Sequence, residues 1–448
     1  MEKRNSMLEG SLWDQLILFA LPLALSSTLQ QLFNAADTAV VGRFAGSTAL
    51  AAVGANSVVV TLFINALTGL SVGGNVVIAQ YIGANREDKI QDTVHTIVLF
   101  AILGGLVIGA IGLMVASPLL KVMGTPTDTI DLATVYLRLY LLGIPFISLF
   151  NFGSAIIRSS GDTKRPMYCL IVAGIVNLIL NLLFVIGLKM SVAGVALATT
   201  ISNAVSAIMI IYMLIKEEGY LHLNIRKLKI HKEPVIKIIK TGLPASIQGM
   251  VFSIANISIQ SGTNSFGSSA VAGNAAERNF EVLSYFLCNA FNQAAVTFIG
   301  QNYAANKYDR VKKIHLLCML EAVISMMVVD GFFYLTRHTV IQLFTTDPEV
   351  ISYAMIKFNV CILPHFLLCS YEITASALRG MGFSLQPTIV TILGSVGFRV
   401  LWLVTVFKKW HQFNVLLMVY PASWILTGTL MIILYIVLTK KAFKQAKS

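Results

Sequence analysis

Residues 158–166 read RSSGDTKRP, and residues 379–387 read RGMGFSLQP. The two segments carry Arg, Gly and Pro at the same three positions, 221 residues apart. Shifts of 221 or 222 also relate Gly46 to Gly267, Gln80 to Gln301, Asn85 to Asn306, Pro22 to Pro244 and Asn34 to Asn256. The chain is therefore an internal duplication. In so apolar a chain, a duplication is typical of a transporter whose pathway lies between two similar halves.

The composition indicates a membrane protein. Fifty-six per cent of the residues are hydrophobic and only 12% are charged, whereas soluble domains are about 25% charged. We predict an all-α protein with twelve transmembrane helices, because the chain contains twelve apolar runs, each near the length of about 20 residues that spans a bilayer. These runs cover about 15–41, 50–80, 94–116, 132–153, 166–187, 192–215, 241–265, 270–299, 314–336, 350–378, 387–407 and 413–438.

The even number of spans in each copy sets the symmetry. Six spans return the chain to its starting side, so both copies enter the membrane from the same side. We therefore expect two six-helix bundles related by a pseudo-twofold axis along the membrane normal. The predicted lobes are 1–215 and 241–448, and the polar segment 216–240 between them is expected to be an amphipathic cytoplasmic linker.

The distribution of basic residues predicts the orientation. If both termini are cytoplasmic, the inner segments hold 23 Lys and Arg residues and the outer loops hold six. This positive-inside bias predicts a multi-pass protein of the cell inner (plasma) membrane with both termini cytoplasmic. The net charge of +12 is then explained by anionic lipid of the bilayer and not by nucleic acid. We expect a monomer.

Several function classes are disfavoured by missing motifs. The sequence has no GxxxxGK[ST] loop, so ATP hydrolysis is not expected to drive it, and an ion gradient is the alternative. It has neither HExxH nor DDxxD, which a membrane enzyme would be expected to show. The five cysteines show no paired metal spacing. We expect no cofactor beyond a coupling ion, H+ or Na+.

The first half contains one acid that points to function. Ionisable groups inside spans are costly and are rarely present without a use. Asp37 should lie in the outer half of the first span, and Asn177 and Asn181 should share a face of the fifth span at similar depth. We therefore expect these three side chains to meet in one polar pocket. The repeat partner of Asp37 is Ser258 or Ile259, and an acid present in only one copy favours a functional role over a scaffold role.

The second half holds candidates with two open interpretations. Glu277 and Glu281 lie four residues apart, and Arg399 is expected at similar depth. An internal ion pair of either acid with Arg399 or Arg278 is as well supported as a substrate or cation site. The candidate substrate or second cation site comprises Glu277, Glu281, Arg399, Glu372 and Asn256. Four other charged residues are expected near span ends, where they can snorkel and need no role: Arg138, Glu321, Asp330 and Lys357.

Two prolines are candidate hinges. Pro22 and Pro244 occupy matching places in the first span of each copy. Each removes a helical hydrogen bond and permits bending.

Several motifs together resemble one family. They are NAADT (34–38), VGR (41–43), ALAA (49–52), QNYAA (301–305), LRG (378–380) and RSSGDTK (158–164). The chain resembles the multidrug and toxic compound extrusion (MATE) transporters, of the bacterial DinF/NorM type, along essentially its whole length. The resemblance implies two bundles facing across a central cleft, and export of a cationic small molecule driven by inward flow of H+ or Na+.

The resemblance also assigns residues. Asp37 matches the first-helix aspartate thought to bind the coupling ion, in a motif that begins at Asn34. Asn177 matches the asparagine of a fifth-helix motif that usually ends in an acid, where this chain has Asn181. A proton taken up by Asp37 could bend the first helix and release substrate, or Na+ could bind at Asp37, Asn177 and Asn181. Because the same superfamily contains flippases, a flippase of a lipid-linked sugar remains the alternative function.

Overall fold

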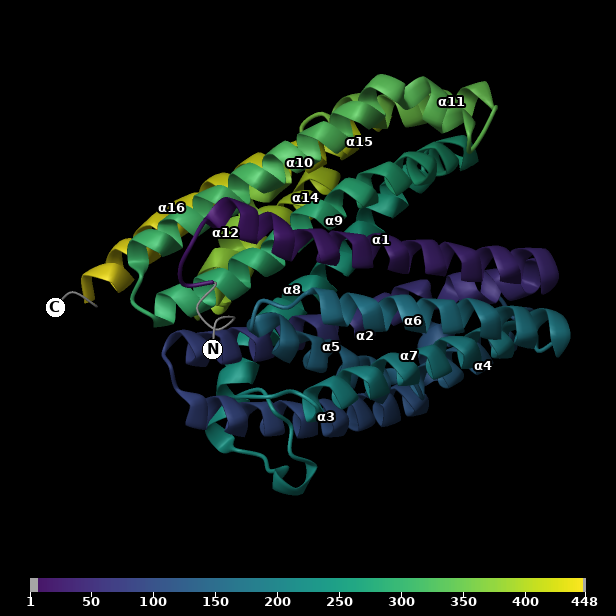
Figure 1. Ribbon diagram of the computed structural model, residues 1–448. Coiled ribbons are helices and arrows are strands. Elements are labelled where there is room, and N and C mark those ends of the chain that lie inside the picture. The colour runs from purple at the N-terminus through teal and green to yellow at the C-terminus, as the bar shows by residue number, and fades with distance from the viewer. Residues whose placement is uncertain (1–6, 446–448) are drawn as a thin grey trace. The chain divides into compact units, whose positions relative to one another are not determined.

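The structure is a computed structural model that describes residues 7–445, and over this range it contains helices and turns but no strand (Figure 1). The first half contains α1 (Leu12–Phe44), α2 (Ser47–Gly83), α3 (Glu87–Val122), α4 (Ile130–Leu141), α5 (Ile144–Ser159), α6 (Lys164–Asn181), η2 (Leu182–Gly187) and α7 (Ser191–Ile215). The second half begins after η3 (Ile225–Lys227) with α8 (Lys232–Asn264), α9 (Ser268–Ala304), α10 (Tyr308–Gln342) and α11 (Pro348–Lys357). It continues with η4 (Phe358–Ile362), η5 (His365–Leu368), α12 (Cys369–Gly380), α13 (Leu385–Thr391), η6 (Ile392–Gly397), α14 (Phe398–Trp402), η7 (Leu403–Phe407), α15 (Phe413–Leu417) and α16 (Val419–Gln445).

The helices account for the predicted membrane spans. Ten helices within the described range are long and apolar enough to cross a bilayer. Two further spans are bent pairs: α4 with α5, at 43°, and α11–η4 with η5–α12, at 46°. With each pair taken as one span, the described chain has twelve spans, at the predicted positions. The prediction of an all-α membrane protein is confirmed.

The sequence repeat is also a repeat of backbone geometry. Turns at matching positions adopt the left-handed region, with φ near +60° at the asparagines and near +90° at the glycines. The left-handed region is accessible to glycine, and Asn tolerates it better than most residues. The matched pairs are Gly46 and Gly267, Asn85 and Asn306, and Gly161 and Gly382. The residues that revealed the duplication therefore include those that fix the same turns in both copies.

Packing divides the chain into two compact units. One unit is Leu25–Ser246, and the other joins the described residues up to Ala24 to those from Ile247 onward. Both boundaries fall inside helices, α1 and α8, and each lies two residues beyond a proline, Pro22 or Pro244. Each of these helices therefore contributes to both units.

Small residues pack the start of α8 tightly in the Leu25–Ser246 unit. A Cβ atom on Gly69 of α2 would overlap the backbone of Ser246, and one on Gly73 would overlap Gly242. The Ser246 hydroxyl donates to the carbonyl oxygen of Ala66 at 2.7 Å. Such close approach of small residues is a common way to join helices in a membrane.

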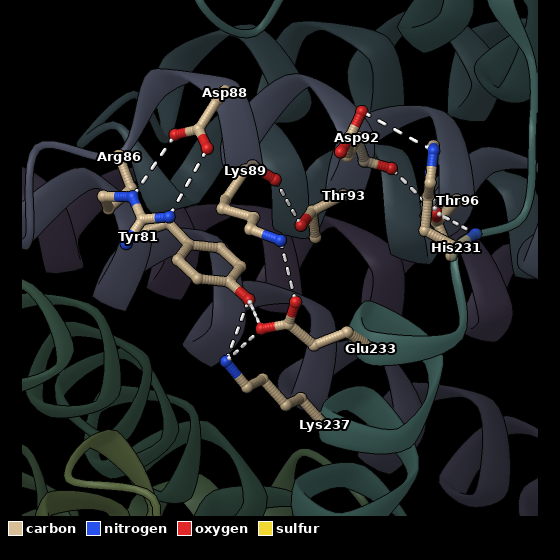
Figure 2. A network of polar contacts seen from close by, with 10 residues as sticks. All are labelled: Tyr81, Arg86, Asp88, Lys89, Asp92, Thr93, Thr96, His231, Glu233 and Lys237. Atoms are coloured by element: carbon tan, nitrogen blue, oxygen red, sulfur yellow. Dashed lines mark hydrogen bonds and ion pairs between the residues drawn. The ribbon is translucent and has the colours of Figure 1, made fainter.

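A polar network holds the first two turns of α8 against α2 and α3 of the same unit (Figure 2). Glu233 accepts from Lys89 of α3 at 2.8 Å, from Lys237 at 2.9 Å and from the hydroxyl of Tyr81 of α2 at 3.1 Å. Because these groups are exposed to solvent, each ion pair contributes little to stability. The network therefore positions the start of α8 beside α2 and α3 and adds little to the stability of the fold.

Candidate functional site

A close contact between α1 and α6 brings the first candidate residues together, all inside the Leu25–Ser246 unit. Gly174 of α6 lies directly against the ring of Phe33 of α1. Asp37 is one turn after Phe33, and Asn177 and Asn181 are one and two turns after Gly174. The glycine thus lets the two helices approach so closely that polar groups one turn further along can meet.

The three predicted residues form one hydrogen-bonded chain. The amide of Asn181 donates to Asp37 Oδ1 and also to Asn177 Oδ1, the second bond at 3.2 Å. The amide of Asn177 donates to the Thr199 hydroxyl of α7 at 3.4 Å. That hydroxyl donates to the carbonyl oxygen of Val195 at 2.9 Å. The sequence did not point to Thr199; it carries no charge and lies on a different span.

Asp37 has no basic partner. Over the described residues no ion pair involves Asp37, and its hydrogen-bond partners are side-chain amides. Tyr136 of α4 lies within electrostatic range of its carboxylate. Asn181 is buried, and its Oδ1 has no hydrogen-bond partner. The site thus offers one negative charge and a buried free oxygen, and oxygen ligands of this kind suit hard cations. It can accept a proton or a small cation.

Asn34 is not part of this chain. Its residue is exposed, and its backbone carbonyl accepts from the Thr38 hydroxyl at 2.9 Å. A π-helical segment, η2, begins directly after Asn181. Such segments are frequent at functional sites because they widen one turn and redirect the side chains beside it.

The acids of the second half pair with a different base from those considered in the sequence. Lys357 Nζ of α11 lies 2.7 Å from Glu277 Oε2 and 3.0 Å from Glu281 Oε2 of α9. The Lys357 side chain is 3% exposed, so the expectation that it snorkels at a span end is wrong. It turns inward because two carboxylates four residues apart face it.

Two more ionisable residues extend this group. His365 Nδ1 lies 3.3 Å from Asp330 Oδ2 of α10, and His365 Nε2 lies 4.0 Å from Glu281 Oε1. The hydroxyl of Ser284 forms a hydrogen bond of 3.0 Å with His365 Nδ1. Asp330 is buried, as is Glu321, and both were expected at span ends. The exposed position of Arg138 agrees with the expectation for that residue.

Arg399 makes a separate set of contacts. Its guanidinium donates to Ser423 Oγ at 3.3 Å and to Asn256 Oδ1 at 3.5 Å. It also lies over the rings of Tyr420 and Phe252, at 4.9 and 5.4 Å from their centroids. Amide, hydroxyl and ring contacts of this kind can hold a buried cation without a carboxylate. Arg399 and Asn256 therefore meet each other but pair with neither Glu277 nor Glu281.

Glu372 also lies apart from the Lys357 group. It accepts from the Asn292 amide at 3.3 Å. Arg379, of the repeated motif, donates to Gln248 Oε1 at 2.5 Å, and Thr388 donates to the same oxygen at 3.4 Å. This arrangement joins the end of α12 to α8 and α13, which gives the motif a structural use.

The two candidate hinges lie within unbroken helices. Pro22 and Pro244 are buried inside α1 and α8, respectively. All five cysteines are buried and unbridged. Among residues 7–445, no group of three His, Cys, Asp or Glu side chains is arranged to hold a metal ion.

Comparison with known proteins identifies the family. The MatE family profile matches residues 22–183 and 244–404, which together cover more than half of the chain. The chain belongs to the MatE family. The two matches start at Pro22 and Pro244 and are offset by the same 221 to 222 residues as the sequence repeat. As a member of this family, the chain is a membrane transporter and not an enzyme.

Individual relatives cover nearly the full chain. The chain is 29% identical over 399 residues to the probable multidrug resistance protein YoeA of Bacillus subtilis. This alignment covers 87% of this chain and 86% of YoeA. It is 27% identical over 386 residues to the probable multidrug resistance protein NorM of Thermotoga maritima, with 85% and 82% covered. A crystal structure of a MATE protein in complex with MaL6 superposes with a TM-score of 0.92, at 23% identity, over 99% of this chain and 100% of that one. This last likeness establishes the shared MATE fold.

Proposed function

We propose that this transporter is a secondary antiporter that exports cationic lipophilic compounds in exchange for H+ or Na+, with Asp37 as its coupling residue. The observation that carries the proposal is the absence of a basic partner for Asp37 among the described residues. Its relatives named as multidrug resistance proteins support the substrate class.

A carboxylate in a membrane span that has no basic partner needs a proton or a cation to neutralise its charge. When Asp37 is ionised, the Asn181 amide stabilises the charge only in part, because a neutral donor cannot cancel it. A proton or Na+ cancels it fully. A cationic substrate and the coupling ion then need the same negative charge at different times, which is the basis of exchange.

The residues beside Asp37 fit either ion. A proton needs only the carboxyl oxygens, whereas Na+ could also use Asn181 Oδ1, Asn177 Oδ1 and the Thr199 hydroxyl. Because Asn181 is neutral, the site carries a single negative charge and is balanced by one monovalent ion. Bending of α1 at Pro22 is the step that we propose to follow ion binding.

The positive-inside distribution supports placement in the bacterial plasma membrane with both termini cytoplasmic. A monomer is the working unit that we propose. Three residues of the inner count, Lys3, Arg4 and Lys447, lie outside the described residues. The network around Glu233 would then lie on the cytoplasmic side.

The test is Asp37→Asn in proteoliposomes loaded with a cationic lipophilic dye, under an imposed H+ or Na+ gradient. An amide is nearly isosteric with the carboxylate but cannot take up a proton at physiological pH, so gradient-driven dye transport should fall to the level of empty vesicles. The matched control is Asp128→Asn, at an exposed carboxylate, which should transport like wild type.

Wild-type dye transport by Asp37→Asn under either gradient would remove Asp37 from the mechanism. Movement of a lipid-linked sugar by wild type, with no dye transport under either gradient, would instead support the flippase alternative.

A further inference from the structure

The candidate acids of the two compact units differ in whether a basic side chain lies beside them. Asp37 has no basic partner, whereas Glu277 and Glu281 share the ammonium of Lys357 at 2.7 and 3.0 Å. The side chains of Glu277, Lys357 and Glu281 are 0%, 3% and 18% exposed. An ammonium at these distances from a buried and a half-buried carboxylate stands where a small monovalent cation would otherwise be required.

The lysine cannot leave this place. Lys357 is the last residue of α11, and the π-helical segment η4 follows it directly. Its helix packs along α9, which carries both acids. The whole Lys357 side chain is buried, so its ammonium is part of the chain and is also held in place by packing.

The surrounding charged groups do not supply a second free cation. His365 contacts Glu281 and Asp330, and Arg278 is exposed on α9. Cys361 and Tyr420 lie within electrostatic range of Lys357, and Arg278 lies within range of Glu281. Arg399 lies within range of Cys361 and Tyr420. Arg399 is already engaged by Asn256, Ser423 and two rings.

We propose that Lys357 is a built-in cation that permanently occupies the place between Glu277 and Glu281, so that these two acids exchange no ion during transport. If the proposed function holds, the ion site at Asp37 has no counterpart at this acid pair. Glu277 and Glu281 then serve structure and not coupling.

The test measures thermal unfolding of the full chain purified in detergent. All variants carry Asp37→Asn, so that the first unit cannot contribute a cation effect. Each is measured in NaCl and in N-methyl-D-glucamine chloride of equal ionic strength. The parent should unfold at the same temperature in both salts, and adding Glu277→Gln to it should leave this independence unchanged.

Lys357→Met should make the stability of the protein depend on an added cation, because Glu277 and Glu281 lose the ammonium between them. In N-methyl-D-glucamine chloride its unfolding midpoint should fall by about 10 °C, because Glu277 and Glu281 lose their counter-charge. Na+ or methylammonium should restore much of this loss. Lys357→Met combined with Glu277→Gln has the same net charge as the original trio and should show no Na+ dependence.

Two results would overturn the proposal. One is Na+ stabilisation of the parent that Glu277→Gln abolishes, because the acids would then bind an ion despite the lysine; this comparison decides even if Lys357→Met does not fold. The other is a Lys357→Met protein whose stability is unaffected by Na+ and methylammonium. Both readouts are independent of transport, so they stand whether or not Asp37 couples export.

Discussion

Adding one methyl group at Gly174 should disturb the Asp37 site without touching a polar residue. In Gly174→Ala the new carbon would overlap the Cδ2, Cε2 and Cζ atoms of the Phe33 ring. If the ring alone rotates away, the strain is about 0.5–1.5 kcal/mol. If α1 moves, overpacking adds about 1–3 kcal/mol, and the bond from Asn181 to Asp37 lengthens. Because the ring is half-buried and lies directly against Gly174, we expect helix displacement and a stability loss of about 1–3 kcal/mol.

The matched control is Gly104→Ala, because a Cβ atom there would meet nothing within 4 Å. This control should be neutral or slightly stabilising, as alanine favours a helix over glycine by about 1 kcal/mol. Unfolding of detergent-purified protein and dye transport in vesicles are measured for both variants. Phe33→Leu introduced into Gly174→Ala should recover stability and transport, since the shorter side chain vacates the space. The reasoning fails if Gly174→Ala behaves like Gly104→Ala, or if Phe33→Leu deepens the loss.

Two other predictions concern coupling and orientation. Asn181→Asp should retain transport and make the dependence of its rate on H+ or Na+ concentration steeper, because two adjacent carboxylates cannot both stay ionised without a second ion. Transport rates are measured over a range of pH and of Na+ concentration. A dependence equal to that of wild type would contradict this prediction. In a cysteine-free background, single cysteines at Gly46 and Lys189 should react with an impermeant maleimide applied to intact cells, and one at Lys229 should not. Labelling at Lys229 would reverse the proposed orientation.

The meeting of Asp37 with Asn177 and Asn181 could be predicted because it depends on regular geometry. Two residues four apart share a helical face, and counting residues along a straight span gives their depth. Thr199 could not be found in this way. Its contribution depends on how α6 packs against α7, and nothing in its own segment distinguishes it from other span hydroxyls.

The partner of Glu277 and Glu281 was missed for a related reason. Lys357 was placed by counting from the end of a span, but that span is a pair of helices bent by 46° with a π-helical segment directly after the lysine. Linear counting does not hold across such a break. The signal in the sequence was the acid pair itself, because two buried carboxylates four residues apart require a base nearby.

The boundaries of the spans were predictable to within several residues, although most helices extend beyond their apolar runs. α8 begins at Lys232, inside the segment expected as a linker. Its first two turns are rich in Lys, Glu and Ile, and Lys and Glu are good helix formers outside the membrane. Hydropathy marks only the part of a helix that lies in lipid.

The division of α1 and α8 between the compact units constrains how such a chain can arise and be taken apart. Neither copy of the sequence repeat contains all the residues of one unit, because each copy contributes the beginning of its first helix to the other. A single ancestral copy could therefore complete a unit only by exchanging that segment with a second copy, as domain-swapped dimers do. Fusion of the two genes turns this exchange into an intramolecular one. A cut in the connector between α7 and α8 would give two fragments, neither of which contains all the residues of one unit.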